Sequence, residues 1–470
     1  MTTRAGLPLA AGALAHDGRT IAAVATAPGR GALAMVRISG PEARAISQRL
    51  LAPPPSVPRH ATHTLVRDAS GATIDDVIAT LYLAPHSSTG EDLVEVTTHG
   101  GLVAPTAVLA AAIEAGARQA EPGEFTRRAV LNSKLDLLQA EAIGDLVNAR
   151  SRTAHRVALR QLDGGLSRRL ADLRRQLLGL EALLAYDIDF PEEDDGPVPR
   201  ARIEQATTGL LAALRALLAT AARGTLVHDG ALVVLAGPPN AGKSSLFNAL
   251  LGEARAIVTD IPGTTRDAIE ALLDLPGYPL RLVDTAGLRE TRDSLERLGI
   301  ETSERYLARA AVVLACGDTR AALAAAVSAA RAQTSAEIIA TFTKRDLMVQ
   351  DDHLADDVRG DVEVTTVRVS AQTGEGLAEL LRAVEARLDL VHGTLDLDAP
   401  ALTAARHRAA VSLAEVELEA FERAWREDSL PPSIAAIHLR GAADALGELI
   451  GTVQVDDVLD VLFASFCVGK

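Results

Sequence analysis

Residues 237–244 read Gly-Pro-Pro-Asn-Ala-Gly-Lys-Ser, directly after an apolar run at 232–236 and before a helical pattern at 245–251. Glycines let backbone N–H groups curl around phosphate oxygens at a helix N-terminus. Lys243 adds a positive charge for the β- and γ-phosphates, and the Ser244 hydroxyl can ligate Mg²⁺. This strand–loop–helix context predicts a nucleoside triphosphate site. The residues expected to bind are Asn240, Ala241, Gly242, Lys243, Ser244 and Ser245.

Two motifs that sense the γ-phosphate and the metal follow along the chain. Residues 263–267 read Gly-Thr-Thr-Arg-Asp, and Thr264 or Thr265 can close onto the metal. Residues 284–287 form the second motif, in which Asp284 can hold Mg²⁺ through water and the Gly287 N–H can contact the γ-phosphate. Thr285 and Ala286 complete that loop.

Two motifs that read the base come next. In Thr343-Lys344-Arg345-Asp346, the Asp346 carboxylate can accept both N1–H and N2–H of guanine, a pair that adenine lacks. A backbone donor to guanine O6 can come from Ser370, Ala371 and Gln372. Five motifs in this order predict a GTPase.

Two departures from the common GTPase pattern carry information. Thr343 stands where Asn is usual, so we expect weaker nucleotide binding, with the preference for guanine kept by Asp346. Leu288 stands where Ras-like enzymes place a glutamine that orients water. Since leucine cannot orient water, another group must do so.

Length and composition indicate a folded, multidomain chain. The 470 residues predict about three domains at roughly 150 residues each. The formal net charge of −15 disfavours non-specific coating of nucleic acid, although local basic stripes could still hold RNA. Charged residues break the apolar runs before they reach the length that spans a membrane. Two distant cysteines, Cys316 and Cys467, favour a reducing compartment. A short apolar stretch at 7–15 favours an N-terminal extension, with a weak secretory signal as the alternative.

The pattern along the chain predicts a multidomain α+β and α/β fold. Residues 20–130 mix strand patterns (20–25, 33–38, 77–83, 93–97) with a helix at 101–115, which indicates one α+β domain. Residues 135–222 and 400–470 are helical in pattern. Between them, residues 230–390 alternate strands and helices, as a parallel α/β sheet does. We therefore expect a helical domain with an α/β domain inserted into it.

Two charged stretches in the helical region have open interpretations. Residues 187–195 are mostly acidic and read as a solvated loop, with a metal site as the alternative. The basic stretch at 150–175 either helps to hold RNA or is a solvated helix face paired with acidic stretches. Aromatic residues are only 3% of the chain, so few are available to stack on bases.

The motifs together resemble the tRNA modification GTPase MnmE (TrmE) family. The resemblance rests on residues 237–245, 263–267 and 284–289, on N-terminal motifs at 27–31, 37–40, 89–92, 121–125 and 132–136, and on the terminal Phe-Cys-Val-Gly-Lys at 466–470. It implies an N-terminal α+β folate-binding and dimerisation domain (1–132), a helical domain (133–228 and 390–470) and an inserted Ras-like P-loop G domain (229–389).

The resemblance also implies an activity. Members are cytoplasmic homodimers that form a heterotetramer with an FAD-dependent partner and have no membrane segment. They add an aminomethyl or carboxymethylaminomethyl group to C5 of wobble uridine 34 of certain tRNAs. The one-carbon unit comes from a 5-formyl- or 5,10-methylene-tetrahydrofolate, and GTP hydrolysis is stimulated by K⁺. An Era/Der-type ribosome-assembly switch is the main alternative, and a membrane-transport GTPase is a second.

Roles for individual residues are implied by the same resemblance. The implied K⁺ ligands are Asn240 and Thr264 with the backbones of Thr259 and Ile261. The implied Mg²⁺ ligands are Ser244 and Thr265. Glu296 takes the general-base role, since a glutamate can polarise water. The nucleotide loop also includes Asp260, Pro262 and Gly263, and the folate site takes Arg37, Glu95, Lys134 and Lys470.

Cys467 keeps three interpretations at this point. It is a buried structural cysteine, a prenylation signal, or a thiol near the folate that adds to C6 of uridine and so activates C5.

Overall fold

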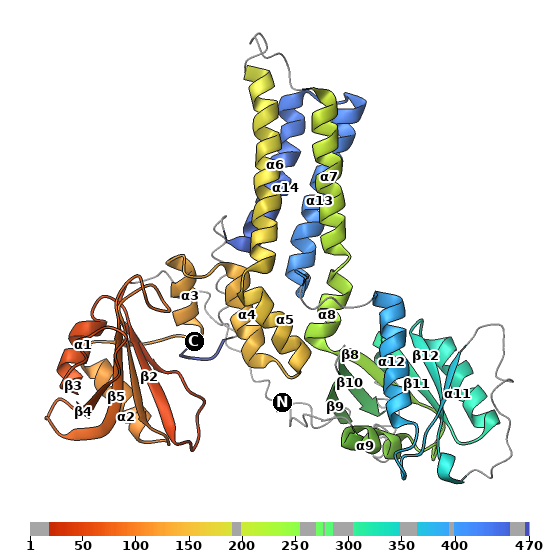
Figure 1. The fold of residues 1–470 in the computed structure, drawn as a ribbon, viewed down its shortest axis with the longest axis horizontal. Helices are drawn as coiled ribbons and strands as arrows, with labels where there is room; N and C mark the ends of the chain where they lie inside the picture. The colour runs from red at the N-terminus through yellow and green to blue at the C-terminus, as the bar shows by residue number, and fades with distance from the viewer. Residues whose placement is uncertain are drawn as a thin grey trace, which may run out of the picture. The chain divides into compact units, whose positions relative to one another are not determined.

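The computed structural model describes residues 18–189, 199–253, 269–275, 278–284, 304–347, 364–393, 399–451 and 466–469. The chain forms two compact units (Figure 1). One unit combines Met1–Gly144 with Gly447–Lys470, and the other is Asp145–Leu446. The four-part division expected from the sequence, with borders at 132, 228 and 389, stays a prediction.

The first unit is built on a seven-stranded sheet with the order β3-β4-β5-β6-β2-β1-β7. Alternating apolar residues bury one face against α1 (Ala43–Leu50) and α2 (Ala104–Glu114), where Val36, Val94 and Ala79 meet Ile46 and Val108. The predicted strands and the predicted helix at 101–115 are confirmed. The strands are β1 (Ile21–Val24), β2 (Leu33–Ser39), β3 (Leu51–Ala52), β4 (Thr62–Arg67), β5 (Thr73–Tyr82), β6 (Leu93–His99) and β7 (Arg118–Gln119).

The chain's C-terminus docks onto this first unit. Phe125 of α3 (Glu124–Leu131) packs with Ile21 and Leu93 on the second sheet face. Near the start of α3, Pro122 forms a β-bridge with Val468, and the Gly123 N–H donates to the Cys467 carbonyl at 3.3 Å. A Cβ at Gly469 would lie 2.4 Å from the Val24 carbonyl oxygen, so only glycine fits this close approach to β1. The terminal motif is therefore part of the N-terminal sheet unit.

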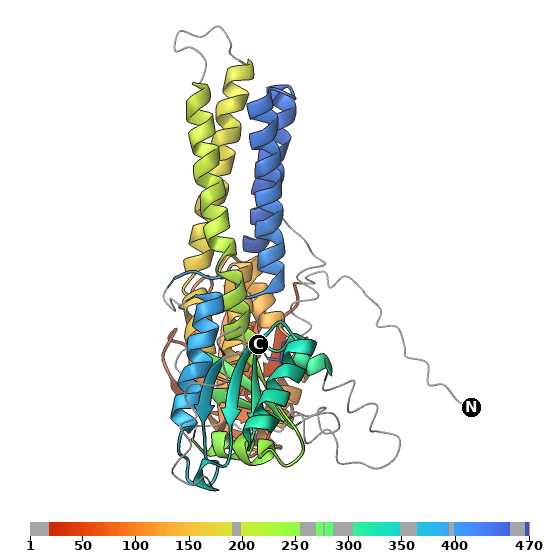
Figure 2. The same ribbon diagram turned by 90° about the vertical axis from the view of Figure 1, so that its right-hand side faces the viewer.

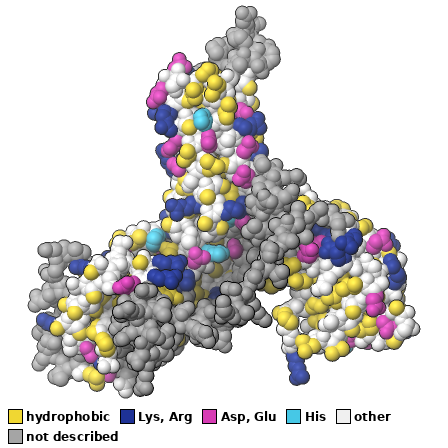
Figure 3. Space-filling model, turned by 180° about the vertical axis from the view of Figure 1, so that it is seen from behind, with side chains coloured by type: hydrophobic (Ala, Val, Ile, Leu, Met, Phe, Trp, Pro, Cys, Tyr) yellow, Lys and Arg dark blue, Asp and Glu magenta, His cyan; other side chains and the backbone are white. Residues whose placement is uncertain are grey.

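Long helices form one part of the second unit (Figure 2). Leu170 and Leu177 of α6, Leu214 of α7 and Phe421 of α13 are buried between them, and exposed acidic and basic side chains alternate along the face in Figure 3. The helices are α5 (Arg152–Leu162), α6 (Gly165–Asp189), α7 (Arg200–Leu218), α8 (Ala221–Asp229), α13 (Ala405–Glu427) and α14 (Pro432–Ile450). The preceding helix, α4, spans Leu137–Asn148.

Two sequence expectations for this region need correction. The acidic stretch was expected to be a loop from residue 187, but α6 continues to Asp189; residues 190–195 lie outside the described part. Within the described residues, the run Arg200–Asp229 is long and apolar enough by composition to cross a membrane. This run is only weak evidence for a membrane-spanning helix, because its apolar residues Ile203, Leu210 and Leu217 are buried inside the unit.

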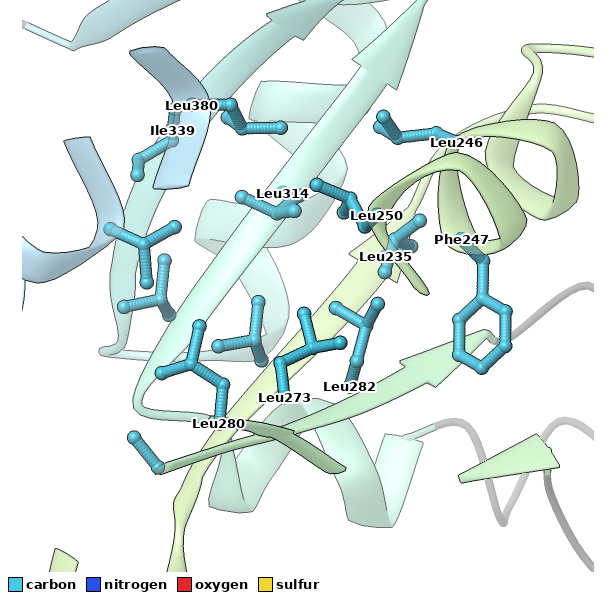
Figure 4. Packing of buried hydrophobic residues seen from close by; sticks show 14 of the residues in the cluster. Leu235, Leu246, Phe247, Leu250, Leu273, Leu280, Leu282, Leu314, Ile339 and Leu380 are labelled. Carbon is cyan, nitrogen blue, oxygen red and sulfur yellow. The ribbon is translucent and has the colours of Figure 1, made fainter. Parts of the chain in front are cut away.

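The other part of the second unit is a six-stranded sheet with the order β13-β12-β11-β8-β10-β9. Alternate side chains pack on opposite faces. Leu235 and Leu314 meet α9 and α12 on one face (Figure 4), and Ala315 and Phe342 meet α11 on the other. The elements are β8 (Ala231–Ala236), α9 (Lys243–Glu253), β9 (Ile269–Asp274), β10 (Pro279–Asp284), β11 (Val312–Gly317), α11 (Arg320–Gln333), β12 (Glu337–Phe342), β13 (Thr365–Arg368) and α12 (Leu377–His392).

The sheet is not wholly parallel, as the sequence pattern suggested. Strands β10, β8, β11, β12 and β13 pair in parallel, but β9 pairs antiparallel with β10, Ile269 opposite Asp284. The short strand β9 carries Glu270 and Asp274, so it lacks the continuous apolar run of a central strand. An antiparallel edge strand of this kind is common on α/β sheets.

Candidate functional site

The loop after β8 is held in the shape that its glycines permit. Gly237 has φ +148°, and a Cβ there would lie 2.3 Å from the Cys316 carbonyl oxygen of β11. Gly242 and Asn240 also have positive φ, +78° and +61°. Positive φ is easy for glycine and tolerated by asparagine. The loop therefore curls back on itself and delivers the chain to the N-terminus of α9, where anions are favoured.

Lys243 lies under this loop and is almost fully buried. Its Nζ donates to the carbonyl oxygens of Gly237 and Pro238 at 2.9 and 2.8 Å. The loop's own carbonyls therefore hold the ammonium group beside the backbone that would bind phosphate.

Ser244, a predicted Mg²⁺ ligand, lies beside Asp284, which was predicted to hold Mg²⁺ through water. The Ser244 hydroxyl at the start of α9 donates to Asp284 Oδ2 at 2.6 Å. Asp284 is the last residue of β10 and is 2% exposed. Parallel strands β8 and β10 end at the same sheet edge, which explains why residues 40 positions apart meet. A hydroxyl and a carboxylate are the oxygen ligands that Mg²⁺ accepts beside phosphates.

A cavity of about 400 Å³ lies at the same edge, where the base is expected. Asp346 stands in a short 3₁₀ turn, Arg345–Leu347, and its Oδ1 accepts a 2.6 Å hydrogen bond from the Ser370 hydroxyl. Ser370 was expected to contribute only its backbone, but its side chain also orients the carboxylate. The cavity is lined by Gly242, Ser245, Leu246, Thr343, Lys344, Asp346, Leu347, Val369, Ala371 and Gln372.

Thr343 connects the base cavity to the phosphate loop. It is 3% exposed, and its hydroxyl donates to the Ala241 carbonyl at 2.8 Å. Lys344, at φ +57°, forms an ion pair of 2.7 Å with Asp318, a residue that follows β11. The hydrogen bond from Lys344 lowers the pKa of Asp318. Sequence reasoning did not find Asp318, because its relation to Lys344 depends on β11 lying beside β12.

Several predicted site residues lie outside the described part of the chain. They are Thr259, Asp260, Ile261, Pro262, Gly263, Thr264, Thr265, Thr285, Ala286, Gly287, Leu288, Glu296 and Lys470. Their assignments to K⁺, Mg²⁺, nucleotide, the general base and folate stay predictions.

A second cluster of predicted residues lies on the sheet of the first unit. Arg37 of β2 and Glu95 of β6 are direct cross-strand partners, and their side chains pair at 2.9 Å. Tyr82 of β5 belongs to the same cluster: burial, and then the Glu95 carboxylate, raise the pKa of the Tyr82 hydroxyl. Sequence reasoning missed Tyr82, although its alternation along β5 places it on the same face as Glu95.

Lys134 lies over the loop between β5 and β6, and its Nζ donates to the Pro85 carbonyl at 3.0 Å. The neighbouring Asn132 amide donates to the Thr89 carbonyl at 2.8 Å, and the Thr89 hydroxyl bonds to Ser39 of β2 at 2.8 Å. This chain of contacts joins Lys134 to the strand that carries Arg37. Cys467 is exposed, so the interpretation as a buried structural cysteine is wrong.

The parallel strands of the sheet, the curled loop between β8 and α9, and the cavity beside Asp346 define a P-loop nucleotide-binding protein of the GTPase class. Residues 137–467 match the model of the MnmE helical domain, and residues 20–134 match that of the GTP-binding protein TrmE N-terminus. The chain belongs to the tRNA modification GTPase MnmE family and is a GTP hydrolase.

Full-length relatives are similar along almost the whole chain. The tRNA modification GTPase MnmE of Moorella thermoacetica is 42% identical over 464 residues, covering 96% of this chain and 99% of its own length. That of Aquifex aeolicus is 39% identical over 455 residues, with coverage of 96% and 99%. Among solved structures, the G domain of the T. maritima FeoB iron transporter aligns with 33% of this chain and 98% of its own, at 26% identity and a TM-score of 0.26.

Proposed function

We propose that this GTPase acts in the modification of tRNA. With an FAD-dependent partner it adds an aminomethyl or carboxymethylaminomethyl group to C5 of wobble uridine 34. The carbon comes from a 5-formyl- or 5,10-methylene-tetrahydrofolate bound by the first unit. The working assembly is a cytoplasmic homodimer that joins two copies of the partner in a heterotetramer.

One observation carries most of this proposal: the C-terminal motif docks on the sheet that bears the Arg37–Glu95 pair. Gly469 lies against Val24, and Val24 pairs with Val36, the residue before Arg37. Exposed Cys467 is thus held within the sheet unit, two residues from Gly469. A guanidinium group suits the carboxylate tail of a folate, and a carboxylate can pair with a pterin edge. A ribosome-assembly switch needs neither group, and residues 20–134 match the TrmE model.

The GTPase step of the proposal relies on a monovalent cation. K⁺ held by Asn240 and Thr264 and by the backbones of Thr259 and Ile261 would neutralise charge that develops on the γ-phosphate, in place of an arginine finger. Glu296 orients the attacking water, and Lys243, Ser244 and Thr265 hold the phosphates and Mg²⁺. Replacing K⁺ by Na⁺ should lower the rate of GTP hydrolysis, most of all at protein concentrations that allow dimers. An equal rate in both salts would contradict this step.

Reconstitution tests the chemistry directly. The chain, its FAD-dependent partner, GTP, K⁺, a methylene-tetrahydrofolate and an unmodified tRNA are combined with either glycine or ammonium, and the nucleosides are analysed by mass spectrometry. We expect a mass gain on uridine that depends on every component. Cys467→Ser should abolish the gain if this thiol activates uridine C5 and should leave it unchanged if the partner supplies the nucleophile. Arg37→Ala should weaken folate binding measured by calorimetry, with Arg49→Ala, an exposed arginine of α1, as the control.

A further inference from the structure

A second cavity lies at the opposite end of the α/β strands from the nucleotide site. Its volume is about 340 Å³, close to that of the cavity beside Asp346 and within the roughly 300–1,000 Å³ typical of small-molecule sites. Gly230 and Pro279, at the amino ends of β8 and β10, line it, whereas Asp284 at the nucleotide site is the last residue of β10. All of its lining residues belong to the second unit. We call it the α5 cavity.

One side of α5 forms a wall of the α5 cavity. The lining residues of this helix and its N-cap recur at spacings of three and four, which places them along one side: Ser151, Ala154, Val157, Ala158 and Gln161. At 1.5 Å per residue, the wall is about 15 Å long. Because an alanine side chain ends at Cβ, Ala154 and Ala158 leave space that a leucine would fill.

The lining is apolar along the middle of this wall and polar toward its ends. Val227 of α8, Leu272 of β9 and Pro279 of β10 add apolar surface to that of the α5 alanines. Arg150 precedes α5 at one end, and Gln161 lies in the last turn at the other. This arrangement suits a small ligand that has an apolar body and polar groups at its ends.

Gln161 supplies a hydrogen-bond donor that lacks a partner. Its side chain is buried, and its Oε1 accepts from the Thr403 hydroxyl at 3.1 Å. Within the described part of the chain, no group accepts a hydrogen bond from its Nε2, although most buried donors in proteins are paired. An acceptor oxygen of a ligand at this end of the cavity would supply the missing partner.

Positive side chains outnumber negative ones in the lining. His228 lies between Asp145 and Asp229, with Nε2 and Nδ1 at 3.1 and 2.8 Å from their carboxylates. The hydrogen bond to Asp145, opposed by burial and helped by Asp229, raises the pKa of His228 to about 9, so the ring is a cation at neutral pH. Both carboxylates therefore already have a cationic partner, and Arg150 and Arg281 add two further positive charges.

Arg150 is the cation of the lining that is available to a ligand. Its side chain is exposed, and it forms no hydrogen bond or ion pair with any residue that the structure describes. A guanidinium group binds a carboxylate or a similar anion through paired N–H groups. An anionic group at this end of α5 would therefore meet an unpaired partner.

We propose that the α5 cavity binds a small amphiphilic anion. Its anionic group pairs with Arg150, its apolar body lies along Ala154 and Ala158, and an acceptor oxygen receives the Gln161 amide. The ligand is no longer than the wall, about 15 Å. The cavity shares no residue with the nucleotide site or the predicted folate site, so the inference does not depend on the proposed reaction.

Two matched fluorescent probes test the site on the full chain, with Mg²⁺ and saturating GDP to keep them out of the nucleotide site. Anilinonaphthalene sulfonate is an apolar body with one anionic group, and phenylnaphthylamine is the same body without the sulfonate. We expect the neutral probe to bind about fivefold more weakly than the anionic one. Arg150→Gln should weaken the anionic probe by the same factor and leave the neutral probe unchanged. Equal affinities of wild type and Arg150→Gln for the anionic probe would overturn the proposal.

Filling the cavity distinguishes it from other apolar surfaces. Ala154→Leu should weaken both probes at least about tenfold, because the leucine occupies the space of the apolar body. Its matched control is Ala206→Leu on the exposed side of α7, and that of Arg150→Gln is Arg202→Gln on the same helix. Both controls should bind the probes as the wild type does. If Ala154→Leu also binds them as the wild type does, the probes lie elsewhere and the proposal fails.

Melting temperatures separate the loss of the cavity from a loss of folding. Ala154→Leu should melt at the wild-type temperature or above it, because the leucine buries apolar surface in space that already exists. If this variant melts lower, Arg150→Gln still decides the proposal, since that substitution changes an exposed side chain and leaves the cavity volume intact.

Competition identifies the body of the ligand. Naphthoate is a flat aromatic carboxylate and octanoate a flexible aliphatic one, and each is titrated against the bound anionic probe. Displacement by naphthoate alone supports an aromatic acid as the ligand, and displacement by octanoate alone supports a fatty acid. Failure of both to displace the probe at millimolar concentration would overturn the proposal.

Discussion

The Thr343 hydroxyl connects the turn that is predicted to bind the base with the loop that is predicted to bind the phosphates. Its bond to the Ala241 carbonyl ties the base-reading turn to the phosphate loop. Thr343→Val removes the donor with little change of shape and leaves a buried acceptor unpaired, at a cost of about 1–3 kcal/mol. We therefore expect GDP to bind roughly tenfold more weakly, as measured by displacement of a fluorescent analogue.

Two substitutions at the same position serve as controls. Thr343→Ser keeps the hydroxyl and should bind GDP as the wild type does. Thr343→Asn keeps a donor and adds an acceptor, so it should bind more tightly, as the sequence alone predicts. Equal GDP affinities for the valine and serine variants would show that the bond to Ala241 does not support the site.

Asp346 should decide which base is bound. Its carboxylate is oriented by Ser370 and can only accept hydrogen bonds. Asp346→Asn can still accept from Ser370 but presents an N–H₂ group toward the base. Guanine then loses an acceptor for its N2–H, and xanthine, which has a carbonyl at C2, gains a donor. We expect GDP affinity to fall about hundredfold and XDP affinity to rise; an unchanged preference for GDP would contradict the assignment of the cavity.

At the scale of elements, the side chain of His228 in α8 contacts Asp145, the first residue of the second unit. It lies in the last turn of α8, with Nδ1 2.8 Å from Asp229 and Nε2 3.1 Å from Asp145 near the end of α4. The hydrogen bond to Asp145, opposed by burial and helped by Asp229, raises the pKa of His228 from 6.5 to about 9. The protonated ring can donate to both carboxylates at once.

The stability that this histidine adds should depend on pH. Because the pKa in the folded state lies above that of the unfolded chain, the contribution is full below about pH 6.5 and is lost as pH rises through about 9. His228→Gln should therefore lower the melting temperature most at pH 6 and hardly at all above pH 9.5. His155→Gln, which changes an exposed histidine of α5, should have little effect at any pH. An equal loss of melting temperature at pH 6 and pH 9.5 would show that protonated His228 does not stabilise the fold through Asp145 and Asp229.

The elements that the sequence predicted well are those with a single dominant pattern. The central strand β8 is a continuous apolar run because both of its faces are buried, and the phosphate loop follows it. The edge strand β9 was missed because its apolar run, residues 271–273, is short and lies between Glu270 and Asp274, and because the strand depends on β10 for its pairing. The site residues show the same division. Motif spacing located Asp284 and Asp346, but Tyr82 and Asp318 are recognised only when the pairing of strands places them beside Glu95 and Lys344.

At the scale of the whole molecule, one chain joins a GTP-hydrolysing sheet domain to a separate sheet unit that its own C-terminus completes. Because β8 follows α8 and α13 follows the last elements of the α/β sheet, the chain enters and leaves that sheet domain through helices. Conformational changes at the nucleotide can therefore reach the helical region through two chain connections, from β8 to α8 and from α12 to α13. We therefore predict that these parts serve a single reaction on tRNA.

The most direct test of that claim is mass spectrometry of wobble uridines in tRNA from cells that lack this protein. We expect the aminomethyl or carboxymethylaminomethyl group at C5 of uridine 34 to disappear and the wild-type chain to restore it. Asp346→Asn should fail to restore the group at cellular GTP levels. Unchanged modification in cells without the protein would show that the protein does not act in this reaction.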